Sequence, residues 1–133
     1  EGVRRYCQPG NAYHQGRRGK AYSGVCPAGM EGGFLQAYRA GRELFDLEAD
    51  VQRTARKLKH KRARLNAIEV DMRDTGLELV AAGVTTERRV ILLDELRKLE
   101  QDRANTKAQI PVLEAELERQ ENRLIAISSG HEY

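Results

Sequence analysis

Apolar residues recur in alternating steps of three and four from residue 44 onward, which is the heptad pattern of helices that pack side by side. The first series is Leu44, Leu47, Val51, Thr54, Leu58, Lys61, Leu65, Ile68, Met72, Thr75, Leu79 and Ala82. The second series is Leu92, Leu96, Leu99, Arg103, Thr106, Ile110, Leu113, Leu117, Gln120, Leu124 and Ile127. The pattern predicts two long helices, each with one buried seam.

A short connection near residues 83–86 separates the two series. Gly83 suits the left-handed end of a helix. Thr85 or Thr86 can cap the helix that follows, and Glu87 is favourable in its first turn. Because so short a connection makes consecutive helices antiparallel neighbours, residues 42–127 are predicted to form an antiparallel coiled-coil hairpin.

Charge gives a second indication of how the two helices pair. If Leu79 faces Leu92, then Leu44 faces Ile127 at the other end. In this register, the basic segment 53–64 begins opposite Glu114, Glu116 and Glu118. That segment contains Arg53, Arg56, Lys57, Lys59, Lys61, Arg62 and Arg64 and no acidic residue. Opposite charges beside a seam select the pairing of coiled coils, so two separate features favour one register.

Residues 1–41 have a different composition, with nine of the twelve glycines, both cysteines and four of the five tyrosines. We expect a small, loop-rich head from which the first long helix begins near Pro27, a residue suited to a first helical position. The aromatic residues Tyr13, Tyr22, Phe34, Tyr38 and Phe45 are the expected core between head and hairpin. Residues 128–133 are expected to be a flexible tail.

Cys7 and Cys26 are the only cysteines, and they lie in the Gly- and Tyr-rich head. Neither a CxxC spacing nor a His-Cys cluster accompanies them, so a zinc site lacks ligands. The pair is best interpreted as one disulfide in a domain with little core, which implies an oxidising compartment. Two buried free thiols in a cytosolic protein are the alternative.

Size and charge restrict the class of protein. The chain has 133 residues and a net charge of +3, too small an excess to indicate nucleic acid or a membrane surface. No apolar run is long enough to cross a membrane, and residues 1–20 do not have the pattern of a signal peptide. Since the sequence opens with Glu1, we expect any export signal or lipid anchor to lie upstream.

No motif indicates catalysis, a cofactor or a metal. Gly16-Arg17-Arg18-Gly19 has the form of a nucleic-acid-binding GxxG loop, but no surrounding sheet is predicted, and glycines so spaced more often permit close packing or turns. His14, Ser23, Ser128 and Ser129 form no recognisable catalytic set. We therefore expect no enzyme activity, no catalytic residue, no cofactor and no metal ligand.

The head also resembles a known family. The matching residues are Tyr6-Cys7, Asn11-Ala12-Tyr13, Gly16, Gly19, Tyr22, Gly24-Val25-Cys26-Pro27, Phe34-Leu35, Tyr38 and Gly41-Arg42. The later residues Gly83, Thr85, Glu87-Arg88 and Leu92-Leu93 are similar to the turn of the same proteins. The family is the uncharacterised bacterial domain of unknown function 2799, whose members look like exported envelope proteins and lipoproteins. The resemblance implies a periplasmic, membrane-tethered protein, and it brings no activity or catalytic residue.

Two surfaces are candidates for function. The first is an apolar cluster around the turn, outside the seam, and it consists of Leu77, Val80, Val84, Val90, Ile91 and Leu93. The second is a basic surface of Arg4, Arg5, Arg17, Arg18 and Lys20 in the head and Arg53, Arg56, Lys57, Lys59, Arg62 and Arg64 in the hairpin. We expect a structural or interaction module of the cell envelope that contacts an envelope protein or a second copy through the apolar cluster, unless the turn folds back to cover it. The alternative is a polyanion- or nucleic-acid-binding protein that uses the basic surface.

Overall fold

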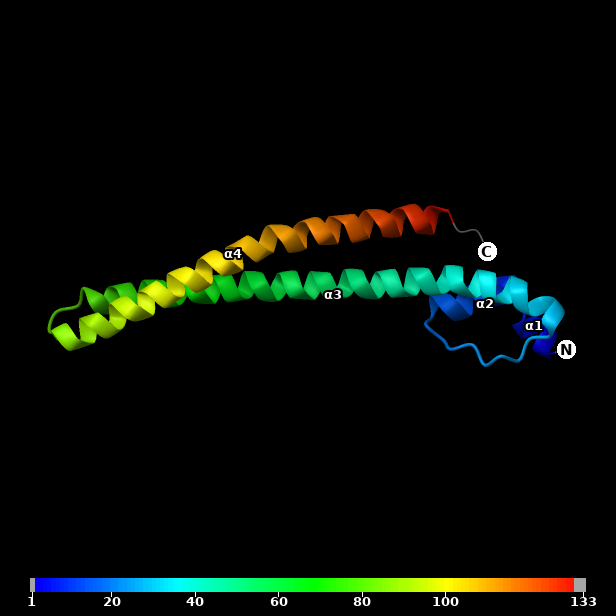
Figure 1. Ribbon diagram of the computed structural model, residues 1–133, viewed down its shortest axis with the longest axis horizontal. Coiled ribbons are helices and arrows are strands. Elements are labelled where there is room, and N and C mark those ends of the chain that lie inside the picture. The colour runs from blue at the N-terminus through cyan, green and yellow to red at the C-terminus, as the bar shows by residue number, and fades with distance from the viewer. Residues whose placement is uncertain (1, 131–133) are drawn as a thin grey trace. The chain divides into compact units, whose positions relative to one another are not determined.

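The computed structural model describes residues 2–130, and this part of the chain is all α-helical, as predicted. Its helices are α1 (Gly2–Tyr6), α2 (Pro9–Arg17), α3 (Ala28–Leu79) and α4 (Thr86–Ser129) (Figure 1). The chain forms two compact units. We call residues 1–53 with 117–133 the head unit, and residues 54–116 the tip unit.

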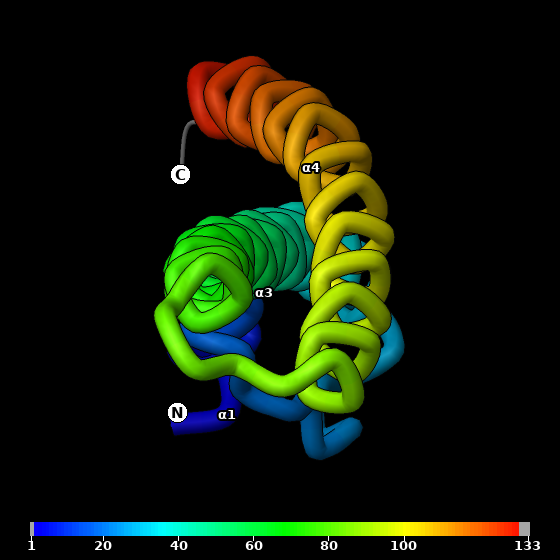
Figure 2. Tube along the Cα trace, turned by 90° about the vertical axis from the view of Figure 1, so that its left-hand side faces the viewer, coloured from blue at the N-terminus to red at the C-terminus, as the bar shows by residue number. Residues whose placement is uncertain are grey.

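The tip unit is the helical hairpin that the heptad pattern predicts. Within it α3 and α4 run side by side from the turn that joins them (Figures 1 and 2). Leu58, Ile68, Leu92 and Thr106 are buried, and the other predicted seam positions from residue 54 to 79 and from 92 to 113 are buried or half-buried. Ala82 is the exception: it is exposed because α3 ends at Leu79, so Ala82 lies in the turn and not in the seam.

The N-terminal part of the head unit contains two short helices where loops were expected. Pro9 opens α2, and the side-chain amide of Asn11 donates a hydrogen bond of 2.7 Å to the Tyr6 carbonyl. This part of the chain is rich in glycine and contains few large aliphatic residues, so its local sequence predicts no helix. Contact with α3 stabilises α2 instead, since Ala12 and Gly16 are both buried.

Two glycines allow α2 and α3 to approach very closely. A Cβ atom built on Gly16 would clash with the Tyr38 carbonyl oxygen and lie 2.7 Å from the Arg42 nitrogen. A Cβ atom built on Gly41 would clash with the Tyr13 carbonyl oxygen and lie 2.8 Å from the Arg17 nitrogen. The crossing therefore brings backbone against backbone, and a side chain on either glycine would push the helices apart.

The head core surrounds the predicted Cys7–Cys26 disulfide, whose Cα atoms are 5.7 Å apart. Phe34 is fully buried, and the Tyr22 ring lies 4.7 Å from it between ring centres. The core cluster consists of Cys7, Ala12, Cys26, Phe34 and Ala37, with Tyr6, Tyr13, Tyr22, Met30 and Tyr38 packed against it. Phe45 was expected in this cluster but packs against Gly19 and below the Arg42 guanidinium, 5.1 Å from its ring centre.

The last turns of α4 run along the first half of α3 in the head unit (Figure 1). Leu44 and Leu47 are buried there, and Arg123 forms an ion pair of 3.1 Å with Glu43. Helix α4 continues to Ser129, two residues into the segment predicted as a tail. Residues 131–133 of that segment lie outside the described residues.

Candidate functional site

The turn between α3 and α4 is built as its sequence indicates. Gly83 has a φ of 83°, a left-handed conformation that glycine adopts without strain. The Thr85 hydroxyl accepts a hydrogen bond of 3.1 Å from the Arg88 backbone N–H and so caps α4. The Arg88 side chain reaches back across the turn to Glu78 at 2.8 Å. These contacts order the backbone at the end of the hairpin.

The apolar side chains around this turn are exposed. The exposed fractions are 63% for Leu77, 78% for Val80, 62% for Val90, 50% for Ile91 and 55% for Leu93. Val84, the remaining member of the predicted cluster, is half-buried. We call these six residues the hydrophobic tip. The turn does not fold back over five of them.

The seam explains why these side chains stay outside. Leu92 is fully buried against α3, and Leu96 and Leu99 follow it at seam spacing. In a helix of 3.6 residues per turn, residues one or two positions from Leu92 point to other faces, so Val90, Ile91 and Leu93 cannot reach the same seam.

A charged cluster borders the tip on α4. The Asp94 carboxylate accepts a hydrogen bond of 2.6 Å from Arg97 and lies 3.0 Å from the Lys98 ammonium. The hydrogen bond from Arg97 lowers the pKa of Asp94, and the hydrogen bond from Lys98 lowers it further by a smaller amount. Asp94 therefore stays ionised beside an apolar surface.

The basic segment 53–64 is only partly neutralised. Arg62 pairs with Glu114 at 3.0 Å and Arg64 with Asp102 at 3.8 Å, both across the hairpin. Arg53 was expected to face Glu118, but it pairs with Asp50 of its own helix at 2.6 Å. In the described part of the chain, no ion pair engages Arg56, Lys57, Lys59 or Lys61. Two of the seven basic residues therefore pair across the hairpin, so charge matching involves fewer residues than expected.

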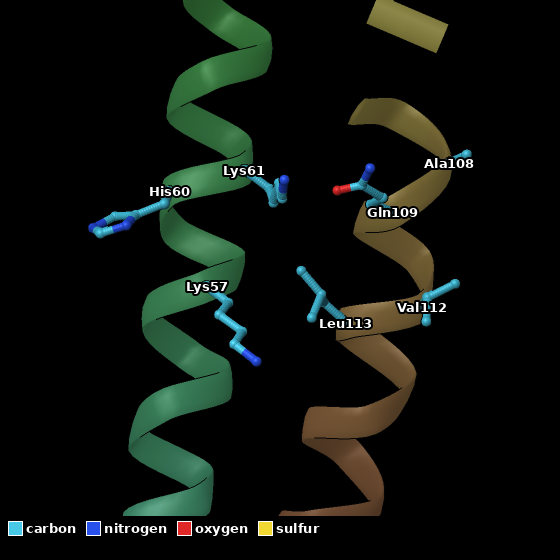
Figure 3. A pocket seen from close by; sticks show the side chains of 7 residues that line it. All are labelled: Lys57, His60, Lys61, Ala108, Gln109, Val112 and Leu113. Carbon is cyan, nitrogen blue, oxygen red and sulfur yellow. The ribbon is translucent and has the colours of Figure 1, made fainter. Parts of the chain in front are cut away.

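An open groove of about 520 Å³ lies between α3 and α4 beside this segment (Figure 3). Lys57 and Lys61 extend from α3 toward α4, and Gln109 and Leu113 extend from α4 toward α3. The complete lining is Lys57, His60, Lys61, Ala108, Gln109, Val112 and Leu113. The sequence analysis did not identify this groove. Its signal is the absence of Asp and Glu from residues 103–113, opposite the basic segment.

The basic residues of the head have mixed environments. The Arg17 guanidinium forms an ion pair of 2.5 Å with Glu48, and this hydrogen-bonded contact raises the pKa of Arg17. Arg42 donates a hydrogen bond of 3.1 Å to the Gly19 carbonyl. Arg4, Arg5, Arg18, Lys20 and Arg39 are exposed. Two of the head's cations therefore hold α2 and α3 together, and the others face solvent.

The two glycines of the GxxG sequence have structural roles. Gly16 lies at the crossing of α2 and α3, while Gly19 lies two residues after α2 with a φ of 72° and contacts Phe45. Within residues 2–130, no three His, Cys, Asp or Glu side chains are grouped so that they could hold a metal ion. Across the same residues, no helix combines the length and the apolar character that a membrane crossing requires.

Comparison with known proteins finds a match only in the N-terminal part of the chain. No curated protein and no solved structure matches the chain. A family model described as a protein of unknown function (DUF2799) matches residues 1–43. The residues of the turn that resemble the same family lie outside this matched segment.

Proposed function

We propose that the chain is a non-enzymatic interaction module of the bacterial cell envelope and that the hydrophobic tip is its contact surface. The observation that carries the proposal is the exposure of five large apolar side chains around one turn. Single exposed apolar residues are ordinary on protein surfaces, whereas several around one turn are typical of an interface. The partner is a second copy of the chain or another envelope protein.

The geometry of the tip supports such a role. The Thr85 cap and the Arg88–Glu78 ion pair order the backbone of the turn that carries these side chains before any partner binds. A rigid contact surface loses less conformational entropy on binding than a flexible one. Because these side chains are 50–78% exposed, burying what remains of each would contribute roughly 1–2 kcal/mol before the costs of association.

Two features support the envelope as the location. Disulfides such as Cys7–Cys26 persist mainly in oxidising compartments, among them the bacterial periplasm. The family that the head resembles contains proteins that look like exported lipoproteins, and its model matches residues 1–43. We therefore infer an exported, lipid-anchored protein whose helical hairpin presents the tip to its partner.

The test replaces Val80, Val90 and Ile91 together with serine. We expect the triple variant to lose self-association in sedimentation velocity, or to lose partner recovery by crosslinking in envelope extracts. Its helix content by circular dichroism should stay unchanged, because all three side chains already face solvent.

The matched control replaces three exposed apolar residues of the head unit, Val3, Val25 and Ile125, with serine. This variant loses a similar amount of apolar surface away from the tip and should associate normally. If the tip variant keeps both its mass in solution and its partner recovery, the tip is not the contact surface. Equal losses of association in the two variants would indicate nonspecific hydrophobic association and would also contradict the proposal.

A further inference from the structure

The groove between residues 57–61 of α3 and 108–113 of α4 combines two unpaired cations with an apolar lining (Figure 3). From these observations we propose that it binds a small anionic amphiphile, which is a single aliphatic chain carrying a carboxylate or phosphate group. The site is separate from the hydrophobic tip and does not depend on the function proposed for the tip.

The charge of the groove selects an anion. Lys57 and Lys61 lie one helical turn apart and both extend toward α4. The flanking carboxylates Asp102 and Glu114 are already paired with Arg64 and Arg62. Residues 103–113 supply no carboxylate, and Glu114, which the predicted register places opposite Lys57, is engaged by Arg62, so neither ammonium group forms an ion pair within residues 2–130. A carboxylate or phosphate between them would complete charge-assisted hydrogen bonds.

The other lining residues suit a hydrocarbon chain. Leu113 extends from α4 toward α3 (Figure 3). Ala108 and Val112 also line the groove, at its outer edge, with their side chains directed away from α3. Val112 is 63% exposed, so a ligand lying along this border would cover apolar surface that now contacts water. The methylene stems of Lys57 and Lys61 add further apolar contact below their charged ends.

The dimensions of the groove favour a small molecule over a protein helix or a polymer. Its lining residues span less than two turns of either helix, whereas a docked helix makes contacts over several turns. Its volume of about 520 Å³ falls within the range of small-molecule sites. A nucleic acid would be held by charge along its backbone and would leave the apolar lining without a partner.

The first experiment measures binding of decanoate and decyl phosphate, below their micelle concentrations, by calorimetry on the whole chain. We expect both to bind, and decanol, which lacks the charge, to bind at least tenfold more weakly. Hexanoate should bind more weakly than decanoate, since each buried methylene contributes about a fourfold gain in affinity. Equal affinities for decanol and decanoate, or for hexanoate and decanoate, would overturn the proposal.

The second experiment uses the double variant Lys57→Gln with Lys61→Gln. We expect it to bind decanoate at least tenfold more weakly than the unchanged chain. The matched control is Arg56→Gln with Lys59→Gln, which removes the same charge from neighbouring residues of α3 that do not line the groove. The control should keep its affinity within twofold. Equal weakening in both variants would indicate general attraction to a basic segment and would refute the site.

Two further readouts keep the test decisive. The side-chain amide signals of Gln109 should shift in the NMR spectrum on addition of decanoate, and unchanged signals would place the ligand elsewhere. Lys61 is half-buried, so Lys61→Gln could lower the helix content. In that case the single variant Lys57→Gln, at an exposed position, should still weaken binding of decanoate. A duplex DNA oligonucleotide that binds the same residues more tightly than decanoate would assign the groove to polyanions and overturn the proposal.

Discussion

Replacing Gly41 with alanine tests whether the close crossing of α2 and α3 holds the head together. The added methyl group would clash with the Tyr13 carbonyl oxygen and lie 2.8 Å from the Arg17 nitrogen. Both atoms belong to the backbone of α2, so no side-chain rotation can relieve the contact. Introducing a methylene into a tightly packed site typically costs about 1–3 kcal/mol, and a rigid backbone contact belongs at the upper end.

Alanine also favours the helix, and this gain must be subtracted. Within a helix alanine is more stable than glycine by about 1 kcal/mol. The expected net effect of Gly41→Ala is therefore a loss of about 2 kcal/mol in the free energy of unfolding. Gly33→Ala provides the matched control in the same helix. A Cβ atom on Gly33 meets nothing within 4 Å, so this variant should gain up to about 1 kcal/mol.

Tyrosine fluorescence during urea unfolding provides the assay. Four of the five tyrosines lie in residues 1–41 and the chain has no tryptophan, so the signal reports mainly on the head. The two variants should shift the unfolding midpoint in opposite directions, with the disulfide intact in both. If Gly41→Ala is as stable as Gly33→Ala, the helices do not cross as closely as described.

Two other predictions concern the hairpin and the disulfide. Cysteines at Leu58 and Leu113, in a chain lacking Cys7 and Cys26, should crosslink within one chain on oxidation, because both residues lie in the seam of the tip unit. Recovery of dimers linked only through the cysteine at Leu58 would instead indicate parallel helices from two chains. Alkylation followed by mass spectrometry should detect two thiols only after reduction, and reduction should destabilise the head by about 3 kcal/mol. Free thiols in unreduced protein from the periplasm would contradict both the bond and the compartment.

The heptad pattern predicted the seam almost completely because its cause is local. Each seam residue falls on one face of its own helix, and the spacing of three and four residues is visible without knowledge of the partner. The prediction failed at Ala82, which continues the spacing although α3 ends at Leu79. Periodicity carries no information on where a helix stops.

The head was less predictable because its stability comes from contacts between distant residues. Helix α2 depends on Ala12 and Gly16 fitting against α3, and these small residues give no hydrophobic signal in sequence. Its aromatic type predicts that Phe45 is a core residue, yet Phe45 packs on Gly19 just after α2, a contact that only the structure identifies. The groove escaped prediction for a related reason, since it forms between residues of two helices that are about 50 positions apart in the sequence.

The division of the chain into two units also bears on the order of folding. The head unit is discontinuous, because residues 54–116 intervene between its two parts, whereas the tip unit is one continuous stretch. Contacts near the turn at residues 80–85 close the shortest loops and form fastest. Once α3 and α4 have paired there, the loop that separates residue 53 from residue 117 is already closed. Docking of the last turns of α4 on α3 then requires little further loss of chain entropy, so we expect folding to begin at the turn.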